Sequence, residues 1–221
     1  MSPQVALVGL GGLGCPVAFA LAEAGVSLRL IDEDRVERSN LHRQMLFTEA
    51  QLGLPKVEAA AAALAALNPG LRHETRVEHV VPGRAEALLA DVALVVEGCD
   101  NVPTKFLVSD TAARRGVPVV HGASVGFVGT VLSAQVGRAA CYRCVFEDVP
   151  GDDEAVDCAT AGVYGPVTSL VGALMAAEAL RALEGRDWQP GRVTRVDAWR
   201  GTLRSTTFAR RPGCPGCGPS V

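Results

Sequence analysis

The chain has 221 residues, of which 48% are hydrophobic and 20% are charged, and its formal net charge at pH 7 is −3. These values exclude an intrinsically disordered chain and argue against a nucleic-acid-binding protein, and the length is sufficient for one large domain with a substantial core. No basic segment followed by an apolar stretch opens the sequence, so we predict no signal peptide and a cytoplasmic location.

The first predicted element is an apolar strand over residues 5–8, which runs into three glycines spaced G-x-G-x-x-G. These are Gly9, Gly11 and Gly14, and a helix is predicted to follow over residues 15–24. Glycine permits a tight turn and a close approach of phosphate, and the start of a helix favours an anion. The stretch therefore predicts a nucleotide-phosphate site, although the motif alone does not separate a dinucleotide from a mononucleotide.

Residues 27–32 are predicted to form the second strand, which ends in Asp32. This acid follows the glycines by about twenty residues, the spacing expected of a carboxylate that accepts hydrogen bonds from ribose. A solvated turn residue is the alternative interpretation. The segment that follows, residues 33–44, is polar, rich in groups that bind phosphate or metal, and longer than a simple connecting loop.

A helix is predicted to open at residues 54–56 and to run to about residue 67. Lys56 lies in its first turn, where a positive charge opposes the helix dipole. That position favours a role in contacting a bound anion, and a solvated lysine is the alternative.

The rest of the first 136 residues alternates strands and helices. An apolar run over 92–97 predicts a strand buried on both faces, and Asp100 lies just past its carboxyl end, where α/β sheets bind ligands. Further strands are predicted over 76–81, 117–121 and 127–136, and helices over 84–90 and 103–116. The pattern predicts an α/β fold with a Rossmann-like, doubly wound, mainly parallel sheet.

The second part of the chain, residues 137–221, has a different character. An acidic stretch containing glycine and proline, residues 147–157, predicts a loop. The apolar run over 163–184 contains Pro166, Thr168, Ser169 and Glu178, which favours a buried helix over a membrane span. A β-hairpin is predicted over 193–208. We expect one domain over 1–221, with a nucleotide-binding core over 1–136.

Four of the seven cysteines form two C-x-x-C pairs, Cys141 with Cys144 and Cys214 with Cys217. Four thiolates are the ligand set of a closed tetrahedral zinc site. A redox motif and an iron–sulfur cluster are the alternatives. Zinc at these pairs would hold the end of the chain against the body of the domain.

The remaining cysteines are interpreted separately. Cys158 lies outside the pairs and beside the predicted loop, so it is either a reactive thiol or an inert one. Cys15 and Cys99 are interpreted as buried structural residues. The four histidines show no metal-binding spacing and are interpreted as structural or solvated.

Several motifs occur together in a specific order: Gly9-Leu-Gly-Gly-Leu-Gly14, Asp32-x-Asp34-x-Val-Glu37, Ser39-Asn-Leu-x-Arg-Gln44, Pro55-Lys-Val57, Cys99-Asp-Asn101, Cys141-Tyr-Arg-Cys144, Cys158-x-x-Ala-Gly-Val163 and the closing C-x-x-C. In this combination the sequence resembles the ThiF/MoeB/HesA family, the bacterial relatives of ubiquitin-activating enzymes. The likeness extends almost to the end of the chain.

The resemblance implies an adenylating enzyme that uses ATP and Mg²⁺. Its second substrate would be a small ubiquitin-like sulfur-carrier protein ending in Gly-Gly, whose carboxylate would be converted to an acyl-adenylate with release of diphosphate. A sulfur donor would then form the thiocarboxylate. A homodimer is also implied. The pathway, whether thiamine, molybdopterin, thiolated tRNA or another product, is left open by the sequence.

The resemblance also implies roles for individual residues. Asp32 would hold the ribose, and Arg43 and Lys56 would neutralise phosphate charge as diphosphate departs. Asp100 would ligate Mg²⁺, for which oxygen ligands are suited, and Asn40 would contact the phosphates. Further nucleotide contacts are implied for Gly9, Gly11, Gly12, Gly14, Asp34, Gln44 and Asn101.

Cys158 matches a position that in some family members carries sulfur or a covalent link to the carrier. Two features depart from the family pattern. Only four residues precede the first strand, with no counterpart to the family's N-terminal arginine, and no rhodanese-like region follows Cys217. The sulfur donor, a cysteine desulfurase or a rhodanese, is therefore expected to be separate. Two rival functions remain, a nicotinamide-dependent oxidoreductase and a catalytically impaired scaffold of the same family.

Overall fold

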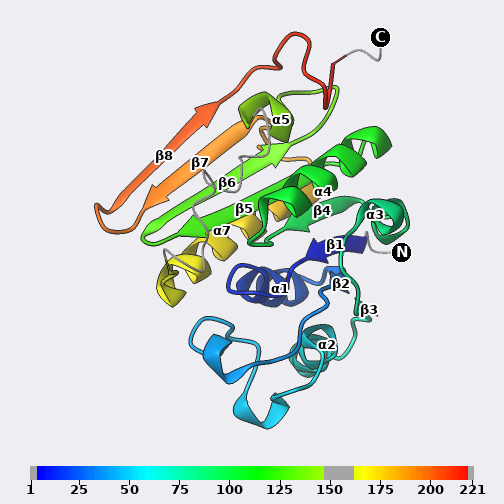
Figure 1. Cartoon of the computed structure of the whole chain (residues 1–221), viewed down its shortest axis with the longest axis vertical. Helices are drawn as coiled ribbons and strands as arrows, with labels where there is room; N and C mark the ends of the chain where they lie inside the picture. Colours follow the sequence, from blue (N-terminus) through cyan, green and yellow to red (C-terminus); the bar gives the residue numbers. More distant parts are fainter. Residues whose placement is uncertain (1–3, 147–161, 219–221) are drawn as a thin grey trace.

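A single eight-stranded sheet organises the molecule, in the order β3-β2-β1-β4-β5-β6-β7-β8 (Figure 1). The computed structural model describes residues 4–146 and 162–218. The strands are β1 (Gln4–Val8), β2 (Ser27–Ile31), β3 (Glu74–Arg76), β4 (Leu94–Glu97), β5 (Val119–Val125), β6 (Val128–Ala134), β7 (Arg192–Asp197) and β8 (Thr202–Thr207). Pairing is parallel from β3 through to β5 and antiparallel from β5 to β8. The predicted Rossmann-like α/β fold is confirmed.

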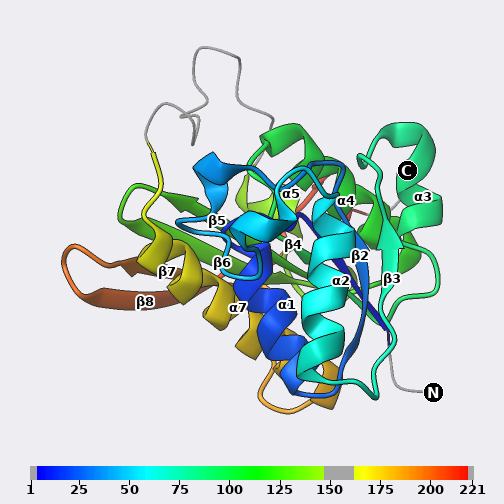
Figure 2. The same ribbon diagram turned by 90° about the horizontal axis from the view of Figure 1, so that it is seen from below.

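Helices cover both faces of the sheet. They are α1 (Gly14–Glu23), α2 (Lys56–Leu67), α3 (Pro82–Leu88), α4 (Val102–Arg115), α5 (Tyr142–Val145) and α7 (Gly165–Glu184), with short 3₁₀ helices η1 (Arg38–Asn40) and η2 (Glu49–Gln51). Helices α1, α2 and α7 form one layer, and α3 packs on α4 and α4 on α5 in the other (Figure 2). This arrangement explains why β4 is buried at all four positions.

Helix α7 is the one helix of the described residues that is long and apolar enough to cross a membrane. It lies instead in the core, as predicted, because Val171 and Met175 are fully buried against the sheet and α1. Small residues allow this close packing. A Cβ on Gly172 would lie 2.7 Å from the carbonyl oxygen of Leu13, and one on Gly122 would lie 2.1 Å from the sulfur of Met175.

The structure corrects one strand. The prediction over 76–81 is wrong, because β3 spans only Glu74–Arg76 and pairs with β2 alone. The strand forms an edge of the sheet, and Val77 and Val81 remain exposed rather than packed. The hairpin predicted over 193–208 is confirmed as β7 and β8. The loop predicted over 147–157 lies outside the described residues.

Candidate active site

A cavity of about 610 Å³ lies at the carboxyl ends of β1, β2 and β4 and extends over β5 and β6. Strand β1 sits between β2 and β4, so the chain turns to opposite sides of β1 at this edge. Such a crossover leaves a crevice in which open α/β sheets bind ligands. The cavity is lined by residues from the glycine turn, from the segment after β2, from the start of α2 and from the turn after β4.

The glycine turn has a steric explanation. Gly9 has φ of +89°, and a Cβ there would lie 3.1 Å from the backbone nitrogen of Cys99. A Cβ on Gly14 would lie 1.9 Å from the carbonyl oxygen of Gly9, which no side chain can tolerate. Gly11 differs, because a Cβ there would meet nothing within 4 Å, and Gly11 lines the cavity. Two glycines therefore form the turn, and the third keeps the backbone open to a ligand.

Asp32 is fixed at the end of β2 by the backbone. Its Oδ2 accepts a hydrogen bond from the backbone N–H of Leu10 at 2.6 Å, and its Oδ1 accepts one from that of Asp34 at 2.8 Å. Burial raises the pKa of the Asp32 carboxyl, while Lys56 and these two N–H groups oppose that rise. The carboxylate is thus oriented before any ligand arrives, with its remaining lone pairs available at the cavity.

Lys56 is not a solvated lysine. It is 4% exposed, and its Nζ lies 2.6 Å from Oδ2 of Asp34. The backbone N–H of Lys56 also donates to the carbonyl oxygen of Asp34, so the start of α2 is tied to the segment after β2. These contacts place one ammonium group at the wall of the cavity that the glycine turn also lines.

The segment around η1 contributes a second cation. Arg43 lines the cavity, and within residues 4–146 and 162–218 its guanidinium has no hydrogen-bond or ion-pair partner. Asn40 lies at the end of η1, and Gln44 follows with 2% exposure and an Oε1 that has no hydrogen-bond partner. An unpaired guanidinium beside an unsatisfied buried amide is typical of a ligand site.

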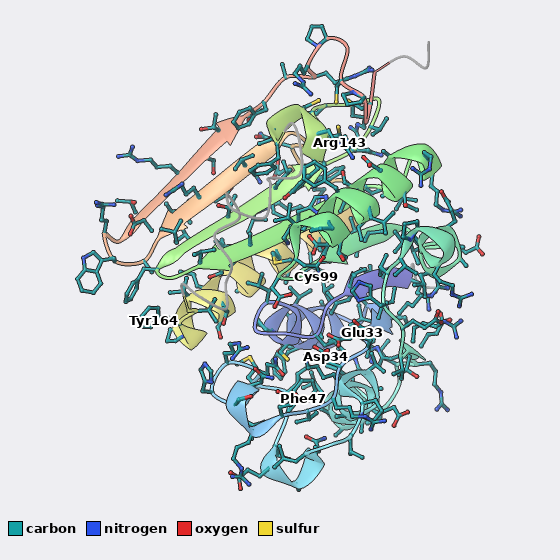
Figure 3. The ribbon with its side chains drawn as sticks, viewed as in Figure 1. Glu33, Asp34, Phe47, Cys99, Arg143 and Tyr164 are labelled. Atoms are coloured by element: carbon teal, nitrogen blue, oxygen red, sulfur yellow. The ribbon has the colours of Figure 1, made fainter. Side chains whose placement is uncertain are left out.

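Three predicted residues follow β4. Asp100 is exposed and lines the cavity. Asn101 caps α4, because its Oδ1 accepts a hydrogen bond from the backbone N–H of Thr104 at 2.9 Å. The prediction that Cys99 is a buried structural residue needs correction, because its side chain is partly exposed and lines the cavity. The reason is that β4 ends at Glu97, and the turn that follows carries Cys99 to the cavity wall (Figure 3).

A buried charged network at the same wall is not predicted from the sequence. Glu97 is fully buried and accepts hydrogen bonds from Nζ of Lys105 at 2.9 Å and from Nδ1 of His121 at 3.1 Å. Burial opposes ionisation, yet Lys105 and His121 hold the pKa of Glu97 below its usual value. Burial also lowers the pKa of His121, and Nδ1 is the donor in this contact because an ionised carboxylate only accepts hydrogen bonds. The only feature of the sequence that indicates this network is an acidic residue, Glu97, at the end of an apolar strand.

Replacing Lys105 with methionine should lower the free energy of unfolding by about 3–5 kcal/mol, because the substitution leaves Glu97 buried without its charge partner. Urea denaturation measures this difference. The matched control is Arg186→Met, which removes the exposed pair between Arg186 and Glu184 and should change stability by less than about 1 kcal/mol. Equal losses for the two variants would contradict the buried pair's role.

The four cysteines of the two C-x-x-C motifs come together at the far end of the sheet. Their sulfur atoms lie within 4.8 Å of one another, and the Sγ–Sγ distances from Cys141 to Cys144, Cys141 to Cys214 and Cys144 to Cys217 are 3.8, 3.6 and 3.4 Å. A tetrahedral zinc ion with Zn–S bonds of about 2.3 Å requires sulfur atoms about 3.8 Å apart. The donor set and its spacing therefore fit a structural zinc ion. Cys158 lies outside the described residues.

Together these groups form a site with defined chemistry. Two carboxylates, those of Asp32 and Asp100, and two cations, Arg43 and Lys56, line the cavity together with the glycine turn. In Figure 3, Asp34 and Cys99 are labelled on the two sides of α1, and both line the cavity. Such a set suits a nucleotide whose phosphate charge changes during a reaction.

Comparison with known proteins shows the family of the chain. A model described as "ThiF family" matches residues 2–216. A sulfur carrier protein adenylyltransferase of Thermus thermophilus is 42% identical over 97% of this chain and 82% of the relative, and the SAMP-activating enzyme E1 of Haloferax volcanii is 38% identical over 99% of this chain and 81% of the relative. The structure of E. coli MccB with MccA-N7isoASN has the same fold, with a TM-score of 0.86 at 22% identity over 98% of this chain and 67% of that chain. The chain belongs to the ThiF family.

Proposed function

We propose that the chain is an adenylyltransferase that uses ATP to activate the terminal carboxylate of a small ubiquitin-like sulfur-carrier protein. The observation that carries the proposal is the meeting of Arg43, Lys56 and Asp100 at one cavity beside the glycine turn. The names of two relatives, about 40% identical over nearly the whole chain, support the same activity. Hydride transfer changes no charge on the phosphates, so it does not require a metal-binding carboxylate such as Asp100 beside the two cations.

The chemistry is a nucleotidyl transfer. A carboxylate oxygen of the carrier attacks the α-phosphorus of ATP, a new C–O–P linkage forms, and the bond from that phosphorus to the bridging oxygen breaks. The products are an acyl-adenylate and diphosphate. Arg43 and Lys56 would stabilise the negative charge that builds up on the leaving diphosphate, as preorganised cations at phosphoryl groups do.

Other residues would position the nucleotide. Asp32 would accept hydrogen bonds from the ribose, and Asp34 would hold Lys56 in place through the contact already described. Asn40 and Gln44 would contact the phosphates, and the amide nitrogen of Asn101 remains available because its Oδ1 caps α4. The backbone of Gly9, Gly11, Gly12 and Gly14 would pack against them.

Two metals are part of the proposal. Asp100, a carboxylate at the open edge of the cavity, would hold Mg²⁺, which supplies charge neutralisation at the phosphates. Zinc at Cys141, Cys144, Cys214 and Cys217 would be structural, since four thiolates leave no open coordination position.

After adenylation, a separate sulfur donor would displace AMP from the acyl-adenylate. A homodimer, a cytoplasmic location and a role of Cys158 in sulfur transfer stay predictions.

The test is ATP–diphosphate exchange with each small ubiquitin-like protein ending in Gly-Gly from the source organism. Exchange should appear with one such protein and should disappear when its last two glycines are removed. Binding of that protein with background exchange would instead favour the impaired scaffold. Thermal stabilisation by NAD but not by ATP with Mg²⁺ would favour the oxidoreductase.

A further inference from the structure

One row of side chains crosses the antiparallel half of the sheet from the cavity to its outer edge. The strand registers pair Ala123 with Thr130, Thr130 with Arg195, and Arg195 with Arg204. Residues that lie directly opposite one another on neighbouring strands project from the same face of a sheet. These four side chains therefore form a continuous row on one face, defined here as the arginine row.

The inner end of the arginine row belongs to the cavity. Ala123 and Thr130 both line it, as do His121 and Leu132 in the adjacent row. The short side chains of Ala123 and Thr130 leave room on the sheet surface at this end. Through the pairing of β5, β6, β7 and β8, this sheet face continues within the described residues from the candidate active site to β8, which Figure 1 shows at the outer edge.

The outer end carries two arginines without partners. Arg195 and Arg204 are both exposed, and neither guanidinium has a hydrogen-bond or ion-pair partner in the part of the chain that the structure describes. Two other arginines of this region are paired: Arg192 contacts Glu178, and Arg200 lies 2.9 Å from Asp197. Like charges directly opposite one another destabilise a strand pair, so the position of Arg195 opposite Arg204 does not stabilise the fold.

We infer that Arg195 and Arg204 form the docking site for an acidic surface of the carrier protein whose tail enters the cavity. This inference rests on the proposed function. Charge complementarity indicates an acidic partner, and the continuity of the face indicates the partner that also occupies the cavity. Three interstrand spacings, about 14 Å, separate β8 from β5. An extended tail covers that distance in about four residues, so the acidic groups lie close to the base of the tail.

The test is the double variant Arg195→Gln/Arg204→Gln, measured by ATP–diphosphate exchange with the ubiquitin-like protein that supports exchange in the wild type. The KM for that protein should rise about tenfold at low salt, because two exposed charge pairs are lost. Exchange at saturating carrier and the KM for ATP should stay unchanged. The KM for the carrier should also depend less on NaCl than it does in the wild type.

Three comparisons separate this inference from its alternatives. Arg186→Gln, which removes another exposed arginine, should leave the KM for the carrier unchanged. The double variant should melt at the same temperature as the wild type or at a higher one, because the repulsion between Arg195 and Arg204 is removed. A lower melting temperature together with slower exchange would assign the two arginines a structural role and overturn the inference. If the double variant kept the wild-type KM for the carrier and the wild-type dependence of that KM on NaCl, the inference would also be overturned. Absence of exchange in the wild type would contradict the proposed function instead.

Discussion

Replacing Asp100 with alanine should lower ATP–diphosphate exchange by about a thousandfold. A metal ion at a reacting phosphate contributes several kcal/mol of charge stabilisation, and each 1.36 kcal/mol corresponds to about a factor of ten in rate. Asp100 is exposed at the cavity edge, so the substitution removes a metal ligand without creating a void in the core. Steady-state exchange with a saturating carrier, measured over a range of Mg²⁺ concentrations, provides the readout.

The matched control is Glu86→Ala, which removes an acid that pairs with Arg114 and Arg115 away from the cavity. Its exchange rate should equal that of the wild type. Both variants should show the wild-type melting temperature in the absence of nucleotide. Near-normal exchange by the Asp100 variant at limiting Mg²⁺ would show that another residue holds the metal.

The second large effect concerns the cysteine cluster. Cys214→Ser should abolish stoichiometric zinc and lower the melting temperature by about 10 °C. The two C-x-x-C pairs are 73 residues apart in the chain, so zinc bound to both pairs would act like a disulfide that closes a loop of that size, which contributes about 4 kcal/mol. For a domain of this size each kcal/mol corresponds to about 2–4 °C. Metal analysis and calorimetry of the same preparation measure both effects.

Cys15→Ala is the control for the zinc variant. Cys15 is a buried cysteine outside the cluster, so its replacement should reduce stability through lost packing but leave the zinc content at that of the wild type. A chelator should destabilise the wild type and the Cys15 variant but not the Cys214 variant. If Cys214→Ser retained zinc and its melting temperature, the structural-zinc assignment would be lost.

The part of the cavity formed by the glycine turn, Asp32 and Lys56 is predictable from the sequence because its determinants are local. The steric demands on Gly9 and Gly14 arise within one turn, and the position of Asp32 follows from the end of the next strand. Lys56 in the first turn of a helix contradicts the dipole preference, and the structure supplies the reason, a carboxylate 2.6 Å away. Gly9 and Lys56 both depart from an ordinary local preference, and both line the cavity.

The missed features depend on strand pairing, which no local pattern encodes. Glu97 and His121 meet because β4 and β5 pair in a register that sets them side by side, and Lys105 reaches them from α4. The hairpin of β7 and β8 was predictable, whereas its pairing with β6 across about sixty residues was not. That pairing, not the hairpin itself, brings Arg195 into the row that begins at the cavity.

The cysteine cluster also has a consequence for the order in which the molecule can be assembled during synthesis. Cys214 and Cys217 follow all eight strands of the described sheet in the chain, whereas Cys141 and Cys144 precede β7 and β8. A nascent chain on the ribosome can therefore pair β1 through β6 before the metal site exists. A four-thiolate zinc site would therefore become available only after the last strand of the described sheet has been synthesised.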